Sequence, residues 1–157
     1  MDNLTAVPIP FYEYTSGSWS PASSKSAMQE NVEFLRLVNY NIWFDELEQP
    51  ARFNAVLAEI FALPDVDIVA IQESTPEFIA IARANPTMQR DWLLTDFHDA
   101  AHLSHLYSNF YGNSYLVRKR WAGRIQGWVR EFPKSSLERY IVILDILQQN
   151  STIVQSH

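Results

Sequence analysis

The chain has 157 residues, 47% of them hydrophobic and 19% charged, and a formal net charge of −6. That is about the length of one domain with enough apolar material for a core, which argues against wholesale disorder. The lack of cysteine and a total of four glycines exclude disulfide scaffolds, cysteine-ligated zinc and a glycine-rich phosphate loop. We also expect neither a membrane span nor a secretory signal, because no apolar stretch approaches roughly 20 residues and residues 1–10 carry no basic side chain.

Residues 1–32 are predicted to be a flexible lead-in to a folded part that spans residues 33–157. Residues 15–26 read TSGSWSPASSKS, a polar, serine-rich composition that is typical of a flexible segment. The aromatic stretch PFYEY at residues 10–14 could instead be an arm that packs on the folded part, and the sequence leaves this open.

Two strands separated by a helix are predicted at the start of the folded part. The apolar runs at residues 34–38 and 66–71 are typical of mostly buried strands. Between them, Pro50 suits the first turn of a helix, and apolar side chains then recur at helical spacing until Pro64. The side chains of this repeat are Phe53, Val56, Leu57, Ile60 and Phe61.

A second helix and a run of strands are predicted next along the chain. Thr75 and Pro76 suit a helix cap and a first helical position, so a helix is predicted from there through Ala84. Residues 89–110 mix helix and loop signals. Strands are predicted at residues 114–118, 125–132 and 140–146, with a fourth candidate at residues 152–155. This order predicts an α/β (α+β) fold with one mixed sheet and flanking helices.

The positive charge is concentrated late in the chain. Residues 118–139 hold seven of the twelve basic residues and only two acidic ones, so this window is +5 while the rest of the chain is −11. A basic face of this kind could bind phosphate, and Trp121 and Trp128 inside it could stack on bases. A solvated pair of strands with edge aromatics is the alternative that charge alone favours.

Asn41 and Glu73 are the strongest candidates for chemistry. Each follows a predicted strand, and side chains at neighbouring strand ends of an open sheet come together at one edge. A carboxylate beside an amide suits a hard divalent cation and its phosphate ligand. A structural alternative remains open, in which Asn41 forms a local Asx turn and Glu73 caps a turn. His98, His102 and His105 have the spacing of one helix face and could bind a transition metal, although a solvated segment explains them better.

Two motifs around these residues resemble a known superfamily. LRLVNYNIW at residues 35–43 is similar to the opening T-W-N strand of the endonuclease/exonuclease/phosphatase superfamily. VDIVAIQES at residues 66–74 is similar to its L-Q-E strand, and the expected helix lies between the two. Within the superfamily the chain is most like the type-2 tyrosyl-DNA phosphodiesterase branch. The resemblance implies that Glu73 binds Mg²⁺ (or Mn²⁺) and that Asn41 orients the phosphate, both as catalytic residues.

Later segments extend the resemblance. YGNSYLVRKR, which begins at Tyr111, is similar to the strand that carries an aromatic beside the site, and Arg139 matches an arginine that faces the substrate backbone. QSH is similar to the start of a T-S-H-L strand end, so His157 would be a catalytic residue near the scissile phosphate. There are also departures. Asn39 and Tyr40 replace the T-W pair, and the superfamily's G-D-x-N and S-D-H motifs do not occur in the sequence.

The resemblance implies the N-terminal half of a four-layer α/β/β/α sandwich. The activity of the family would be Mg²⁺-dependent hydrolysis of a phosphodiester, such as the 5′-phosphotyrosyl bond of DNA, inside the cell and in nuclear DNA repair. With two motifs missing, we expect the chain by itself to be inactive. The alternative is a non-catalytic binding or interaction module, which would self-associate through a sheet face left uncovered.

Overall fold

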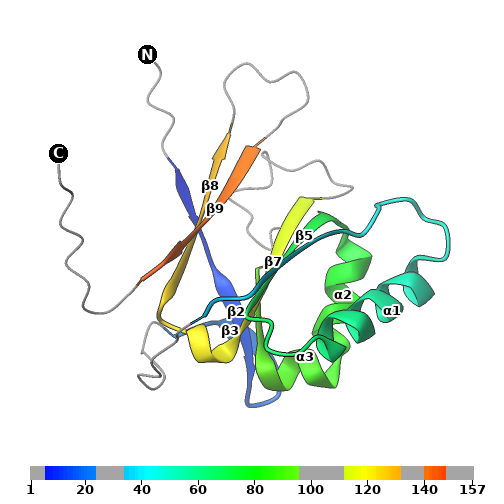
Figure 1. The fold of residues 1–157 in the computed structure, drawn as a ribbon, viewed down its shortest axis with the longest axis horizontal. Helices are drawn as coiled ribbons and strands as arrows, with labels where there is room; N and C mark the ends of the chain where they lie inside the picture. The colour runs from blue at the N-terminus through cyan, green and yellow to red at the C-terminus, as the bar shows by residue number, and fades with distance from the viewer. Residues whose placement is uncertain (1–5, 24–33, 96–111, 132–139, 148–157) are drawn as a thin grey trace.

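The computed structural model of the chain describes residues 6–23, 34–95, 112–131 and 140–147 (Figure 1). The strands in these ranges are β1 (Val7–Ile9), β2 (Phe11–Thr15), β3 (Ser18–Pro21), β4 (Leu37–Asn41), β5 (Ile68–Ser74), β6 (Trp92–Thr95), β7 (Gly112–Arg118), β8 (Ile125–Glu131) and β9 (Tyr140–Ile146). The helices are α1 (Gln49–Ala62), α2 (Pro76–Ala84), α3 (Pro86–Asp91) and the short 3₁₀ helix η2 (Lys119–Trp121). In the described part of the chain, no helix is long and apolar enough to cross a membrane.

The described strands form two sheets. Six strands lie in the order β3-β2-β6-β7-β5-β4 and three in the order β1-β8-β9, and among these neighbours only β4 and β5 are parallel. The predicted mixed α/β class is confirmed, but the strands divide between two sheets where one was expected. The chain changes sheets at Pro10, which has no N–H for a ladder, and at the turn before β8, where Gly123 has a φ of 73°.

The described elements stack in three layers: the helices, the six-stranded sheet and the three-stranded sheet (Figure 1). Val69 and Ile71 of β5 belong to the core beneath α1 and α2. Ile68 of the same strand belongs to a second core with Ile125 of β8 and Leu144 of β9. Successive side chains of a strand point to opposite faces, so β5 is apolar on both sides and its sequence forms a nearly continuous apolar run.

Helix α1 is the crossover that allows β4 and β5 to be parallel. Pro50 lies in its first turn, as predicted, and the helix ends at Ala62, before Pro64. Its buried side chains are Phe53, Val56, Leu57 and Ile60, four of the five on the predicted apolar face, and the fifth, Phe61, is partly buried against the same core. The Phe53 ring meets the Phe78 ring of α2 edge to face, with centroids 5.6 Å apart, so the two helices cover the sheet as one layer.

Thr75 caps helix α2, as the sequence predicts. Its side chain accepts a hydrogen bond from the Phe78 N–H at 3.2 Å, and Pro76 follows it. Replacing Thr75 by alanine is expected to lower the free energy of unfolding by about 1 kcal/mol, because the Phe78 N–H loses its acceptor. Urea unfolding measures the change. Thr75→Ser keeps the hydroxyl and is the control. If it lost as much unfolding free energy as Thr75→Ala, the capping role would be contradicted.

Residues 7–21, predicted to be part of a flexible lead-in, instead contribute strands to both sheets. β1 pairs with β8, β2 pairs with β3 and β6, and Phe11 is only 8% exposed in the core between the sheets. The β2–β3 hairpin turns at Ser16 and Gly17, both with positive φ, as a two-residue type I′ turn requires. A Cβ on Gly127 would lie 3.2 Å from the Phe11 ring, so a larger residue there would press on this ring. The sequence signal for this hairpin was the Ser-Gly pair between two segments with aromatic residues, and the serine-rich composition around it favoured a flexible segment instead.

The first predicted strand is at the edge of the six-stranded sheet, and it is more exposed than expected. It runs over Leu37–Asn41 and pairs with β5, while Phe34 and Leu37 are 83% and 62% exposed. An apolar run at a sheet edge is covered on fewer sides than a central one, so its composition does not ensure burial. The sheet face predicted to be left uncovered packs against the three-stranded sheet over β2, β6, β7 and β5.

A buried carboxylate joins the segments before β4, before β5 and after β7. Asp67 is 1% exposed, and its Oδ1 accepts hydrogen bonds from Trp121 Nε1 and Arg120 Nε, both at 2.8 Å. Its Oδ2 accepts the Arg36 N–H at 3.0 Å. Burial opposes ionisation of Asp67, but these hydrogen bonds and the charge of Arg120 outweigh it and hold its pKa below the ordinary value of 3.8. Asp67 is therefore a charged hub of the fold, at the opposite end of β5 from Glu73.

Candidate functional site

Asn41 and Glu73 lie together at the ends of the parallel strands β4 and β5. Asn41 is the last residue of β4 and is in register with Gln72 of β5. The Asn41 Nδ2 donates a hydrogen bond to Glu73 Oε1 at 2.8 Å, although 32 positions separate the two residues. The proximity that the sequence predicts is therefore present, and the parallel pairing of the two strands produces it.

A bulge in β5 directs the Glu73 side chain. Ile71 pairs with Ser114 and Ser74 pairs with Gly112, so two residues of β5 stand opposite one residue of β7. Glu73 has a φ of 57°, a left-handed conformation that costs a non-glycine residue about 1–2 kcal/mol. The ladder resumes at Ser74, and the Ser114 Oγ also donates a hydrogen bond to the buried Ser74 Oγ at 2.9 Å, across the bulge. Such local strain is common at functional sites, where neighbouring structure holds it in place.

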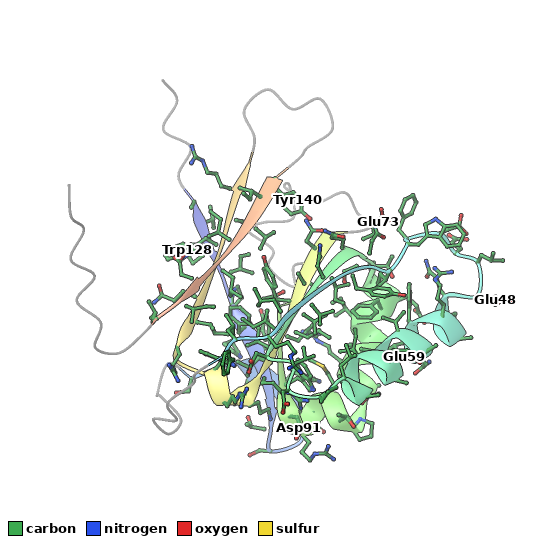
Figure 2. All side chains as sticks on the ribbon, viewed as in Figure 1. Glu48, Glu59, Glu73, Asp91, Trp128 and Tyr140 are labelled. Atoms are coloured by element: carbon green, nitrogen blue, oxygen red, sulfur yellow. The ribbon has the colours of Figure 1, made fainter. Side chains whose placement is uncertain are left out.

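The loop of residues 42–48, which leads from β4 to α1, completes the surroundings of Glu73 (Figure 2). The Phe44 N–H donates to Glu73 Oε2 at 3.1 Å, so each carboxylate oxygen accepts one hydrogen bond. The Trp43 N–H donates to Asn41 Oδ1 at 2.9 Å, which is the Asx turn of the structural alternative. An ionised carboxylate has about four acceptor positions, so about two positions of Glu73 remain for a further ligand.

A shallow depression of about 610 Å³ opens beside this loop. It is lined by Phe44, Asp45, Glu46, Gln49, Thr75, Pro76 and Glu77. The three carboxylates of this lining give it a negative potential, which favours cations over anions. Across the described ranges, no three His, Asp or Glu side chains gather closely enough to hold a metal ion by themselves.

The remaining predicted site residues cannot be placed in this geometry. Tyr111, Arg139 and His157 lie outside the described residues. The predicted histidine cluster, His98, His102 and His105, and the candidate strand at residues 152–155 lie outside them as well. Asn41 and Glu73 are therefore the two predicted site residues that the structure brings together.

The two tryptophans of the basic window bond to carboxylates of the chain. Trp121 is 3% exposed and donates to Asp67, so the suggestion that it stacks on nucleic-acid bases is wrong. Trp128 Nε1 donates to Asp145 Oδ2 of the neighbouring strand β9 at 2.8 Å. Burial explains the first case, because a ring packed between the two sheets cannot also present its face to a base.

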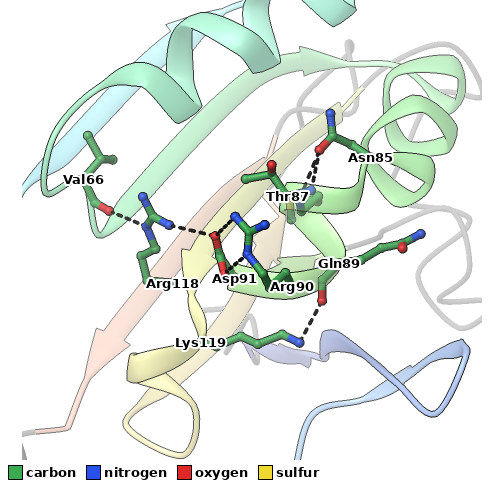
Figure 3. A network of polar contacts seen from close by, with 9 residues as sticks. Val66, Asn85, Thr87, Gln89, Arg90, Asp91, Arg118 and Lys119 are labelled. Atoms are coloured by element: carbon green, nitrogen blue, oxygen red, sulfur yellow. Dashed lines mark hydrogen bonds and ion pairs between the residues drawn. The ribbon is translucent and has the colours of Figure 1, made fainter.

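The first basic residues of the window hold the fold together (Figure 3). Arg118 Nε donates to the Val66 carbonyl at 3.1 Å, and its Nη1 lies 3.7 Å from the Asp91 carboxylate. Lys119 Nζ donates to the Gln89 carbonyl at 2.9 Å, and Arg120 binds Asp67. The Arg90 guanidinium lowers the pKa of Asp91, and the charges of Arg118 and Lys119 add to this effect. These side chains serve internal contacts of the fold, which differs from the solvated pair of strands that charge alone favoured.

Sequence reasoning missed Arg52, which contacts the same loop from the first turns of α1. Its Nη2 donates to the Trp43 carbonyl at 2.8 Å and to the Asp45 carbonyl at 2.6 Å, and its Nη1 donates to the Leu47 carbonyl. The available signal was its isolation, since it is the only basic residue between Arg36 and Arg83, close to an acidic loop.

The candidate site therefore consists of Asn41, Glu73, the loop of residues 42–48 and the arginine that binds that loop. Together these groups offer a carboxylate with free acceptor positions, an amide and an acidic rim. Comparison of the chain with family models, with curated proteins and with solved structures finds no match. The case for a function consequently depends on the chemistry of these side chains.

Proposed function

We propose that this chain forms the metal- and phosphate-binding part of a Mg²⁺-dependent phosphodiesterase site. The observation that carries the proposal is the 2.8 Å hydrogen bond between Asn41 and Glu73 at the ends of parallel strands. Further support comes from the resemblance of the two strand motifs to the endonuclease/exonuclease/phosphatase superfamily. The described layers, helices on a large sheet and that sheet on a second one, are compatible with an α/β/β/α sandwich, although one sheet was expected for its first half.

The donor set fits a Mg²⁺ ion. Mg²⁺ usually keeps several waters and is bound through one or two carboxylates together with substrate phosphates. Glu73 has about two acceptor positions left after its bonds from Asn41 and the Phe44 N–H. The acidic rim formed by Asp45, Glu46 and Glu77 would raise the local concentration of cations.

Each residue has a separate role in this proposal. When bound, Mg²⁺ supplies charge stabilisation on the phosphoryl oxygens. Glu73 binds the ion, and Asn41 holds the carboxylate with one N–H while its second N–H is free to donate to a phosphate oxygen. Tyr111, Arg139 and His157 would contact the substrate, as the resemblance implies. The substrate class is a nucleic-acid phosphodiester, in particular the 5′-phosphotyrosyl bond of nuclear DNA.

Mg²⁺ binding to the full chain tests the site. Calorimetric titration is expected to show saturable binding to the wild type and an affinity at least about 10-fold weaker for Glu73→Gln, which keeps the shape but loses the charge. Glu77→Gln is the matched control, because it makes the same substitution and removes the same charge from the lining of the depression beside the loop. It should change the affinity less than about twofold, since an exposed neighbouring charge is largely screened. Equal losses in both variants, or no binding by the wild type, would refute the metal site.

Cleavage of a 5′-phosphotyrosyl oligonucleotide with Mg²⁺ present tests the substrate class. Any hydrolysis by the chain should require Glu73, so activity that survives Glu73→Ala would exclude this residue as the metal ligand. Cleavage of RNA or of a small phosphodiester in place of DNA would preserve the site and change the substrate.

A non-catalytic protein is the second candidate, and one observation favours it. Asn41 donates to Glu73, and the two side chains accept hydrogen bonds from the Trp43 and Phe44 N–H groups. Two residues that only shape a turn would make the same bonds. In that case Glu73→Gln would alter the free energy of unfolding and would not change the binding of divalent cations. The same pair of titrations therefore separates the two candidates.

A further inference from the structure

The loop of residues 42–48 is held from one side by the start of helix α1. Arg52 reaches three of its carbonyl groups, those of Trp43, Asp45 and Leu47. Gln49 Nε2 donates to the Asp45 carbonyl at 3.0 Å and to the Phe44 carbonyl at 2.7 Å. The carbonyls of residues 43, 44, 45 and 47 thus bond to side chains of α1. The N–H groups of Trp43 and Phe44 bond to Asn41 and Glu73 of the candidate site.

The guanidinium of Arg52 also stacks on aromatic rings. Its central carbon lies 5.0 Å from the centroid of the Trp43 ring and 5.2 Å from that of the buried Phe53 ring. Cation–π attraction of this kind helps to hold the guanidinium near the two rings. Arg52 is therefore in contact both with a core ring of its own helix and with a ring of the loop.

This arrangement opposes backbone strain within the loop. Trp43 and Glu48 have φ values of 59° and 51°, a left-handed conformation that is unfavourable for residues other than glycine. A loop with strained residues at both ends keeps its conformation only where other contacts hold it. Among the side chains that bond to this loop, Arg52 makes the largest number of hydrogen bonds in the described part of the chain, because its two terminal nitrogens bind the carbonyls of Trp43, Asp45 and Leu47.

We infer that Arg52 is a positioning residue of the candidate site. By holding residues 42–48 it keeps the Phe44 N–H and the Asn41 amide on the Glu73 carboxylate, and in this way it sets the affinity of Glu73 for Mg²⁺. The second part of the inference rests on the proposed function, whereas the first concerns the loop alone. Arg52 does not touch the ion, since its bonds go to main-chain carbonyls.

Two measurements on Arg52→Ala test the inference. Hydrogen exchange at the Phe44 amide should become at least about 10-fold faster, because its acceptor is no longer held in place. Mg²⁺ affinity should fall about 10-fold or more, as when an outer-shell partner of a metal ligand is removed. Both effects should reverse when free guanidinium is added at concentrations far below those that unfold proteins, and methylammonium at the same concentration should not reverse them. A purely global loss of stability would not be repaired by guanidinium.

Arg90→Ala is the control, since Arg90 is an exposed arginine whose bonds go to Asp91 and not to the loop. Unchanged exchange at Phe44 in Arg52→Ala, or the same change in both variants, overturns the inference. If the wild type binds no Mg²⁺, the proposed function fails while the exchange data still decide the role of Arg52. Should Arg52→Ala not fold, Arg52→Lys is measured in its place. A single ammonium cannot bind three carbonyls in a plane, so faster exchange at Phe44 is again expected, and no change again overturns the inference.

Discussion

Replacing Asp67 by alanine should lower the free energy of unfolding by about 3 kcal/mol or more, out of the roughly 5–15 kcal/mol that keeps a domain folded. Trp121 would retain a buried N–H without an acceptor, and the Arg36 N–H would lose its partner as well. Arg120 would lose its carboxylate, although its own side chain is 43% exposed and can turn to water. Urea unfolding followed by circular dichroism at neutral pH measures the loss.

Two further variants sharpen the test at this position. Asp67→Asn keeps one acceptor oxygen, enough for Trp121, but loses the charge and the second acceptor that the Arg36 N–H uses, so it should lose less stability than alanine. Asp65→Asn is the control, because that carboxylate is 85% exposed and its ion pair with Arg36 spans 4.0 Å. An exposed pair of this kind is worth less than about 1 kcal/mol. If Asp65→Asn and Asp67→Ala were equally unstable, the hub role of Asp67 would be wrong.

The pH dependence of stability should carry the signature of Asp67. Its pKa is lowered in the folded chain, so the folded state binds the proton less tightly than the unfolded state. Its contribution is fully present above the ordinary value of 3.8 and is lost as the pH falls further, through the folded pKa. The wild type should therefore lose stability more steeply than Asp67→Asn below about pH 4. Asp91, whose pKa is also lowered, is present in both proteins, so its contribution to the pH dependence cancels when the two are compared.

Phe11→Ala is the second substitution with a large expected effect, about 3–5 kcal/mol of unfolding free energy. The ring belongs to the core between the sheets, together with Ile68, Leu93 and Val117. Its removal would leave a cavity where the chain passes from β1 to β2, next to Gly127. The loss would show that residues 7–21 are part of the cooperative fold, and urea or thermal unfolding measures it.

Ser18→Ala provides the control for this substitution in the same segment. Ser18 is exposed in the β2–β3 hairpin, so its loss should change stability by less than about 0.5 kcal/mol. Phe11→Leu should fall between the two, because it retains much of the apolar volume. A Phe11→Ala variant as stable as Ser18→Ala would restore the interpretation of this segment as a lead-in.

The features that the sequence determined by itself are those that depend on near neighbours. The spacing of apolar residues after Pro50 and the Thr75-Pro76 pair place two helices correctly, because capping and helical periodicity act within a few residues. The meeting of Asn41 and Glu73 is predictable for a related reason. A strand–helix–strand unit makes its two strands parallel and adjacent, so residues at their ends must be neighbours.

The features that only the tertiary structure decided depend on which element covers which surface. Leu37 and Trp121 are both apolar residues in or beside strands, yet the first is 62% exposed and the second 3% exposed. Strand β4 is at an edge, while the second sheet packs over the other face of the large sheet. The roles of Phe11 and Arg52 also depend on the tertiary structure. Phe11 packs against residues that are distant in the sequence, and Arg52 binds carbonyls that a strained loop directs toward it. Burial and side-chain partnership are properties of the assembled layers, and no local pattern of residue types specifies them.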